Sequence, residues 1–324
     1  MFKRELPAEA EEPVLPDNAI EIRKLCKAYP ATKRRPELMA LDDVDLVVPR
    51  GSLFGLLGPN GAGKSTLINI LANVVVKSSG DVRIWDIDLE EQPRRAARAI
   101  GIVPQELNFD PFFTARELLD SQAGLYGVPR RERITDELLD MLELADVADV
   151  STRNLSGGMR RRLMVAKSMV HRPPVLVLDE PTAGVDVDLR HTLWEQIQKL
   201  RKTGTTILLT THYLEEAQAL CDQIAILHMG KIVANDTMEN LLQRLDNKSF
   251  VVTVDRDLND VPPNLRPHGW VLEGKRKLKL PSRPTKMSLG QMLLSVQVNG
   301  LNVMDIVTQE TDLEDVFLQI TKSA

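Results

Sequence analysis

Few residues of the 324-residue chain could build a disulfide framework or a metal site. Its two cysteines, Cys26 and Cys221, lie too far apart along the sequence for a metal knuckle and are too few for a disulfide framework. This scarcity fits a reducing compartment. The five histidines cluster neither with the cysteines nor with one another, so the sequence shows no metal site built from these residue types.

Long apolar runs are also missing. No stretch approaches the roughly 18 consecutive apolar residues that span a bilayer. The N-terminus, Met1-Phe2-Lys3-Arg4, leads into acidic, proline-bearing sequence rather than into the apolar core of a signal peptide. We therefore expect a soluble, cytoplasmic protein that would serve a membrane only through a partner.

The chain also lacks an excess of positive charge. The formal net charge is -5 and the isoelectric point is near 5.7, which argues against nucleic acid as the main partner, because such a partner requires a basic surface. Hydrophobic residues make up 43% and charged residues 27% of the chain. This composition is that of an ordinary globular protein with room for one large and one small domain.

The order of apolar patterns predicts an α/β core that contains a helical insertion. Residues 1–18 are acidic and proline-bearing, which predicts a disordered tail. From residue 19 to about 244, apolar runs alternate with helical patterns, and three of the runs predict buried strands of a mostly parallel sheet: Leu53–Leu57, Val175–Leu178 and Thr206–Thr210. Leu67, Ile70, Leu71 and Val74 form one face of a predicted helix. Between Arg116 and Val170 the pattern is almost purely helical, which predicts a helical subdomain over about 107–170.

The remainder, residues 247–324, predicts a small α+β accessory domain. Phe250–Val254, Lys277–Leu280 and Val303–Thr308 have strand patterns. Helices are expected over Ser288–Val298 and Leu313–Ile320.

A phosphate-binding motif follows the first of the predicted buried strands. Glycines let backbone N–H groups converge on phosphate oxygens, and the N-terminus of the following helix adds positive potential. Lys64 is expected to reach the β- and γ-phosphates, and the Ser65 hydroxyl to bind Mg²⁺. The residues of this P-loop are Gly58, Pro59, Asn60, Gly61, Ala62, Gly63, Lys64, Ser65 and Thr66. A GTPase is excluded, because Asn247-Lys248-Ser249-Phe250 lacks the aspartate of a guanine-reading motif.

Two adjacent carboxylates end the predicted strand that begins at Val175. Alternation along a strand points neighbouring side chains in different directions, so Asp179 and Glu180 can take separate roles. With the P-loop, Asp179 would hold the Mg²⁺ shell and Glu180 would polarise the attacking water. Taken alone, the pair could also be surface carboxylates at a strand end.

A third motif decides between these readings. Leu155, Ser156, Gly157, Gly158 and Met159 stand before a predicted helix, and here residues 20 to 240 resemble the ATP-binding cassette (ABC) family. The resemblance implies a P-loop core with an antiparallel β subdomain and an inserted helical subdomain. The ending Thr311–Leu318 and the run Met159-Arg160-Arg161-Arg162 resemble the drug-resistance and polysaccharide exporter branch. The arginines could equally be a solvated helix start.

Further residues take roles from the resemblance alone. It implies that Tyr29 stacks on adenine, that Gln105 contacts the metal, that Ala183–Asp186 is the D-loop with Asp186 at its end, and that His212 is the switch histidine. ATP would lie between the P-loop of one chain and the signature of another, so the active form would be a homodimer.

The expected function is ATP hydrolysis that drives a separate membrane permease, with export favoured over import. The rival readings are a cassette ATPase of DNA repair or translation, which usually carries a coiled-coil insertion or two cassettes, and a P-loop kinase, which would not need Leu155–Gly158. Phe109, Phe112 and Phe113 crowd after Gln105 although aromatic residues are only 4% of the chain. We expect them to anchor the permease near Gln105–Phe113; the alternative is that they fill the core. The sequence does not reveal the cargo.

Overall fold

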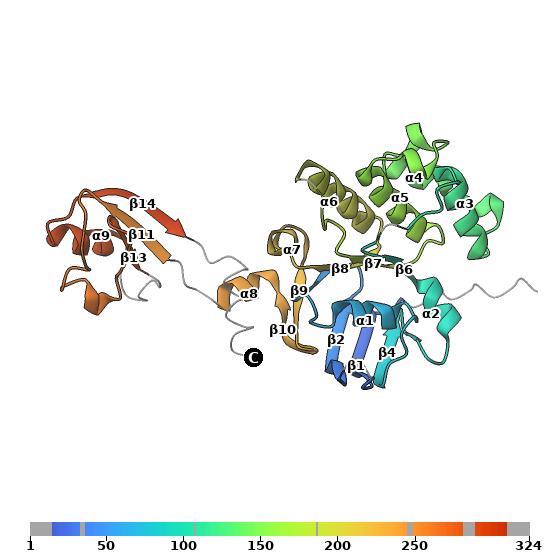
Figure 1. Cartoon of the computed structure of the whole chain (residues 1–324), viewed down its shortest axis with the longest axis horizontal. Helices are drawn as coiled ribbons and strands as arrows, with labels where there is room; N and C mark the ends of the chain where they lie inside the picture. The colour runs from blue at the N-terminus through green and yellow to red at the C-terminus, as the bar shows by residue number, and fades with distance from the viewer. Residues whose placement is uncertain are drawn as a thin grey trace, which may run out of the picture. The chain divides into compact units, whose positions relative to one another are not determined.

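The computed structural model describes residues 15–32, 36–106, 108–185, 187–244, 249–280 and 289–309. The chain divides after Asn235 into two units (Figure 1), each of which is described by itself. The domain boundary expected from the sequence, after residue 244, lies later than this division, since α8 (Met238–Arg244) belongs to the second unit.

A six-stranded sheet forms the centre of the first unit, in the order β10-β9-β3-β8-β7-β6. The neighbours β9-β3, β3-β8, β8-β7 and β7-β6 are parallel, and β3 and β8 are buried along their whole length. Both faces are covered, which explains the uninterrupted apolar runs and confirms the three predicted strands. The strands are β3 (Leu53–Leu57), β6 (Ile100–Val103), β7 (Val175–Asp179), β8 (Thr206–Thr211), β9 (Gln223–His228) and β10 (Lys231–Thr237).

An antiparallel sheet packs beneath it in the order β2-β1-β4-β5: β1 (Asn18–Tyr29), β2 (Leu38–Pro49), β4 (Ser79–Ile84) and β5 (Ile87–Asp88). Helix α1 (Lys64–Leu71) contacts β2 of this sheet and β7 of the central one, and their apolar side chains form a single core. The prediction that the helical face extends to Val74 is wrong. Asn73 has a left-handed backbone, φ 56°, and Val74 is 74% exposed, because the left-handed residue terminates the helix.

Helices cover the other side of the central sheet (Figure 1). The helical pattern between Arg116 and Val170 is confirmed as α3 (Ala115–Leu125), α4 (Thr135–Met141) and α5 (Gly157–Met169), which pack on one another. Short 3-10 turns at Arg130–Glu132, Ala145–Val147 and Thr152–Asn154 connect them. Helices α2 (Pro93–Ala99), α6 (Val187–Lys202) and α7 (Leu214–Leu220) complete the unit. Among the described residues, no helix combines the length and the apolar character required to cross a bilayer.

The second unit has a core of its own. Its sheet has the order β12-β13-β11-β14, with antiparallel neighbours throughout: β11 (Ser249–Val254), β12 (Val271–Glu273), β13 (Lys277–Leu280) and β14 (Val303–Gln309). Helix α9 (Leu289–Val298) packs on it through Met292 and Val296, and Trp270 lies in the same cluster. The predicted strands and the first predicted helix are confirmed, whereas β12 was not predicted. The helix expected at 313–320 and most of the N-terminal tail lie outside the described residues.

Candidate functional site

The P-loop connects β3 to α1, and its glycines are required by close backbone approaches. A Cβ atom on Gly58 would lie 2.3 Å from the carbonyl oxygen of Leu227 in β9. A Cβ atom on Gly63, whose φ is 115°, would lie 2.5 Å from the carbonyl oxygen of Ala40 in β2. The loop therefore lies between both sheets, at positions where only glycine fits.

Lys64 lies inside this curve. Its side chain is buried, and its Nζ atom donates hydrogen bonds to the carbonyl oxygens of Gly58, at 2.5 Å, and Pro59, at 3.4 Å. Nζ also lies 3.5 Å from Oε1 of Glu180. The neighbouring Ser65 is exposed at the helix N-terminus. A compact cation and a hydroxyl thus occupy the positions that a nucleotide triphosphate with its metal requires.

Glu180 is the point at which the predicted site residues meet. Its buried carboxylate accepts a hydrogen bond from Nε2 of Gln105, 3.3 Å from Oε2, and lies 3.2 Å from Nδ1 of His212. With Lys64 on the other oxygen, side chains from three separate segments surround one carboxylate. Gln105 follows β6, His212 follows β8 and Lys64 begins α1. All three segments start at the carboxyl ends of parallel strands, where α/β sheets place their ligands.

The adjacent carboxylate of Asp179 has a different environment. Thr210 of β8 donates a hydrogen bond to Oδ1 of Asp179 at 2.6 Å, and its carbonyl accepts one from the Glu180 N–H at 3.0 Å. Burial raises the pKa of Asp179, opposed by the Thr210 hydrogen bond, while the charge of Glu180 adds to the rise and Lys64 opposes it. Thr210 was missed by the sequence reasoning. Its position two residues before His212, on the strand beside β7, was the available signal.

The two carboxylates have different partners, and strand alternation is only part of the reason. Asp179 is the last residue of β7, and Glu180 has a left-handed backbone with φ 47°. A non-glycine residue in this region is strained, and such strain is found most often at functional sites. The turn carries the Glu180 carboxylate out of the strand toward Lys64.

The set Ser65, Gln105 and Asp179 is compatible with Mg²⁺. The structure holds hydroxyl, amide and carboxylate groups at this place, and Mg²⁺ in nucleotide sites takes one or two carboxylates together with phosphates and water. Among the described residues no cluster of three or more His, Cys, Asp or Glu side chains could hold a metal without a nucleotide.

The signature residues form the start of α5. Ser156 is the N-cap, its hydroxyl accepting a hydrogen bond from the Met159 N–H at 3.2 Å, while Leu155 is buried beneath. Gly157 is exposed, with open space where a side chain would be. The first amides of α5 are therefore presented at the surface as an anion-binding helix end.

The three arginines that follow are more than a solvated helix start, because all three donate to backbone carbonyls, although Arg160 and Arg162 are partly exposed. Arg161 is buried and donates from NH1 to the carbonyl oxygen of Gln105 at 3.0 Å. Arg160 donates to the carbonyl oxygens of Leu155 and Arg153, and Arg162 to that of Leu142 at 3.1 Å. Each guanidinium thus fixes a different backbone segment to α5.

Of the residues predicted from the resemblance alone, Tyr29 ends β1, is half-buried, and has the Lys27 ammonium 4.9 Å from its ring centroid. Ala183–Val185 follow Glu180 in a turn, whereas Asp186 lies outside the described residues. Nothing in the structure therefore describes the last D-loop residue.

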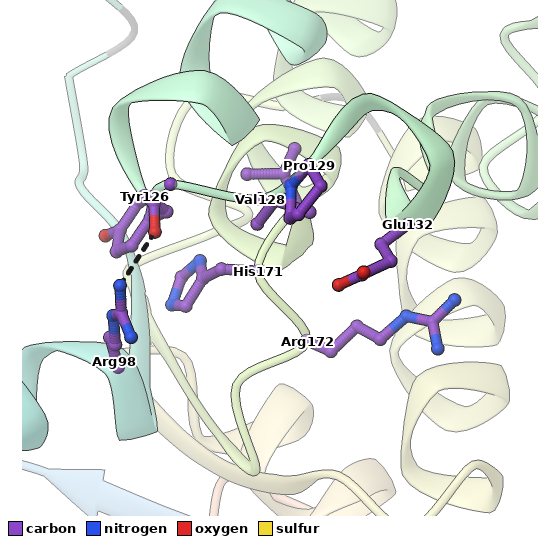
Figure 2. A pocket seen from close by; sticks show the side chains of 9 residues that line it. Arg98, Tyr126, Val128, Pro129, Glu132, His171 and Arg172 are labelled. Carbon is purple, nitrogen blue, oxygen red and sulfur yellow. Dashed lines mark hydrogen bonds between the residues drawn. The ribbon is translucent and has the colours of Figure 1, made fainter.

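The segment after Gln105 borders a cavity of about 630 Å³, whose lining includes Gln105, Glu106 and Tyr126. Phe112, just beyond, is 90% exposed and Phe113 37% exposed, while Phe109 is half-buried. On the other side of Tyr126 lies a second pocket of about 490 Å³ (Figure 2). There the Tyr126 ring stacks on His171 with centroids 3.7 Å apart, and burial lowers the pKa of His171 to about 4.

Comparison with known proteins agrees with this geometry. Residues 41–183 match the model of the ABC transporter family. A daunorubicin resistance ATP-binding protein of Streptomyces coeruleorubidus is 36% identical over 91% of this chain and 94% of its own. The chain belongs to the family of ABC transporter ATP-binding proteins. A Nod factor export ATP-binding protein of Bradyrhizobium diazoefficiens is 35% identical over 87% of this cassette protein and 91% of its own length.

Solved cassette structures share the fold. The ATP-binding subunit of an ABC transporter has a TM-score of 0.61 at 29% identity, covering 70% of this chain and 92% of that one. A dimeric ATP-binding cassette in a post-hydrolysis state, bound to ADP and Pi, has a TM-score of 0.59 at 26% identity, covering 68% and 98%. As a member of this family the chain is an ATPase.

Proposed function

We propose that this ABC ATPase drives export through a separate membrane permease, and that two copies close and reopen around ATP. The observation that carries the proposal is the convergence of Lys64, Gln105 and His212 on the carboxylate of Glu180. Two of the relatives, named for Nod factor export and for daunorubicin resistance, support the outward direction.

Within one protomer, Lys64 would leave Glu180 for the β- and γ-phosphates, which offer it a stronger anion than a single carboxylate. Glu180, released from that ion pair, polarises the attacking water, and His212 binds the γ-phosphate beside it. Mg²⁺, held by Ser65, Gln105 and Asp179, would neutralise charge on the β- and γ-phosphates. Tyr29, at the end of β1, would stack on the adenine.

The second half of each site would come from another copy. The chain contains one P-loop and one signature, and the start of α5 at Ser156 and Gly157 is exposed, so its N–H groups could bind an anion held by another chain. A γ-phosphate bound at Lys64 of one protomer would fill the helix end of its partner, with the D-loop through Asp186 alongside. Hydrolysis removes the bridging phosphate and the dimer reopens.

The permease would bind beside the segment Gln105–Phe113, where Gln105 and Asn108 line the cavity and Phe112 is exposed. This contact would hold the ATPase at the inner face of the cell membrane. Export, for which one relative is named, requires a membrane component, and the cavity next to Gln105 supports a contact at this place.

The proposal is tested with the ATPase co-purified with its permease in vesicles. Wild-type protein should hydrolyse ATP and move cargo outward, and Glu180→Gln should bind ATP but lose nearly all turnover. Size-exclusion chromatography should then show Glu180→Gln trapped as an ATP-bound dimer. Wild-type turnover in Glu180→Gln would remove that residue from the role, and ATP-driven uptake would reverse the proposed direction.

A further inference from the structure

Arg161 connects the signature helix to the site of its own protomer. It lies five residues after the N-cap Ser156, a rise of about 7.5 Å along α5. Its side chain is buried, and its one described hydrogen bond goes from NH1 to the carbonyl oxygen of Gln105, 3.0 Å away and 56 residues earlier in the sequence. The side chain of the same Gln105 donates to Glu180. The Arg161 guanidinium thus links the signature helix directly to Gln105, the residue that donates a hydrogen bond to the proposed base Glu180.

Arg161 is also linked to the helix that follows His212. Burial lowers the pKa of Arg161, and the charge of Glu216 on α7 opposes this shift. Glu216 is fully buried and accepts a hydrogen bond from the indole N–H of Trp194 at 3.1 Å. Glu216 lies four residues after His212. The two side chains close to Oε2 of Glu180, those of Gln105 and His212, therefore both belong to segments that interact with Arg161.

Holding a loop with a buried arginine is energetically unfavourable, because burying a charge costs free energy unless the charge is compensated. An apolar side chain at this position would fill the same volume without that cost. Neighbouring arginines on α5 bond to backbone within the helical region: Arg162 donates to Leu142 of the α4 end. Among the three arginines and their described hydrogen bonds, Arg161 alone donates to one of the residues that surround Glu180.

We propose that Arg161 is a positioning residue, through which the signature helix of a protomer sets the placement of Gln105 in that protomer's own ATP site. When the Ser156 end of α5 binds a nucleotide held by the partner, any shift of α5 moves the guanidinium, and the Gln105 backbone moves with it. The inference rests on the proposed role of Gln105 beside Glu180 and the metal. It provides a route by which one site of the dimer senses occupancy of the other.

The test is a double-mutant cycle between Arg161→Met and Gln105→Ala, measured as kcat and KM for ATP in the full-length protein, together with the Mg²⁺ concentration for half-maximal rate. Arg161→Met should lower kcat about tenfold or more, with KM for ATP within about twofold of wild type, and should raise the Mg²⁺ requirement. Arg161→Lys, which keeps a donor, should recover part of kcat. In the Gln105→Ala background, Arg161→Met should cost less than about twofold, because the residue it acts through is already truncated.

Arg162→Met is the matched control. It removes a neighbouring guanidinium that also bonds to a backbone carbonyl, so it should lower the Tm without changing the Mg²⁺ requirement. Equal losses of kcat from Arg161→Met in both backgrounds, or wild-type kcat in Arg161→Met, would overturn the inference. If instead Gln105→Ala itself leaves kcat and the Mg²⁺ requirement unchanged, the proposed role of Gln105 is wrong, which distinguishes failure of the site from failure of Arg161's role.

Discussion

The Nζ atom of Lys64 lies 3.5 Å from Oε1 of Glu180, and both side chains are almost fully buried. A cation expected to bind phosphate and a proposed general base therefore form a buried ion pair. Binding of a phosphate must exchange this partner for another, so the ion pair links the stability of the free protein to its active residues.

The ion pair between Lys64 and Glu180 predicts that loss of Lys64 destabilises the protein. Lys64→Met should lower the free energy of unfolding by about 1–3 kcal/mol, because it leaves a buried carboxylate with only Gln105 and His212 as neighbours. Adding Glu180→Gln should restore most of the loss, since the uncompensated charge is removed. Urea unfolding without nucleotide measures both variants. Equal stabilities of Lys64→Met with and without Glu180→Gln would contradict the pairing.

Completion of the site across a dimer predicts that Ser156→Arg spares ATP binding by the monomer but blocks dimer closure. A bulky cation would replace a small hydroxyl that caps α5, at the end where an anion should bind. Equilibrium binding of a fluorescent ATP analogue and size-exclusion chromatography with ATP separate the two effects. Mixing with Lys64→Ala protein should restore at most one competent site per dimer. Undiminished ATPase activity of Ser156→Arg alone would argue against shared sites.

The exposed Phe112 should be a permease anchor rather than part of the core. Phe112→Ala with Phe113→Ala should leave the Tm near wild type and retain ATP-dependent dimerisation, yet weaken permease association, because each buried anchor contributes roughly 1.5–3 kcal/mol. Met229→Ala, which truncates another exposed apolar side chain, is the control and should not affect association. A large fall in Tm of the double variant would instead assign the phenylalanines to the core.

The separate core around Trp270 predicts that residues 247–324 are dispensable for nucleotide binding. The truncated protein should bind ATP as wild type does, because the atoms nearest to the P-loop glycines Gly58 and Gly63 belong to the first unit, and the second unit has its own core. Turnover or dimerisation should change, as expected of a domain that stabilises or regulates the dimer. A truncated protein that is folded by circular dichroism but does not bind ATP would exclude this arrangement.

His171 predicts a pH dependence of stability. Burial depresses its pKa to about 4, below the value of 6.5 in an unfolded chain. Between these values the unfolded chain binds more protons, so stability falls as the pH drops from 6.5 through 4. His171→Phe, which keeps the ring stacked on Tyr126, should reduce that fall by about 1–2 kcal/mol after allowance for partial exposure. Urea unfolding at a series of pH values measures the slope; the same slope in His171→Phe as in wild type would contradict the assignment.

Much of the site could be predicted from the sequence because phosphate chemistry constrains neighbouring residues. Three motifs can be recognised directly in the sequence, because each consists of residues close together along the chain: the P-loop, the carboxylate pair and the signature. In contrast, the contact of Arg161 with Gln105 joins residues that are 56 positions apart in the sequence. From the sequence alone, the run of arginines has the pattern of a charged helix start. Only the packing of α5 against the segment after β6 separates the buried arginine from its partly exposed neighbours. The left-handed turn at Glu180 is likewise set by tertiary contacts, since glutamate does not favour that conformation.

The three tryptophans of the chain lie in three different places. Trp85 packs against the core shared by the two sheets, Trp270 belongs to the core of the second unit, and the Trp194 indole is hydrogen-bonded to the buried Glu216. The protein therefore carries its own optical probes. With the other two tryptophans replaced by phenylalanine, the emission of Trp194 would follow the environment of Glu216, and so the helix behind His212, in real time as ATP binds and is cleaved.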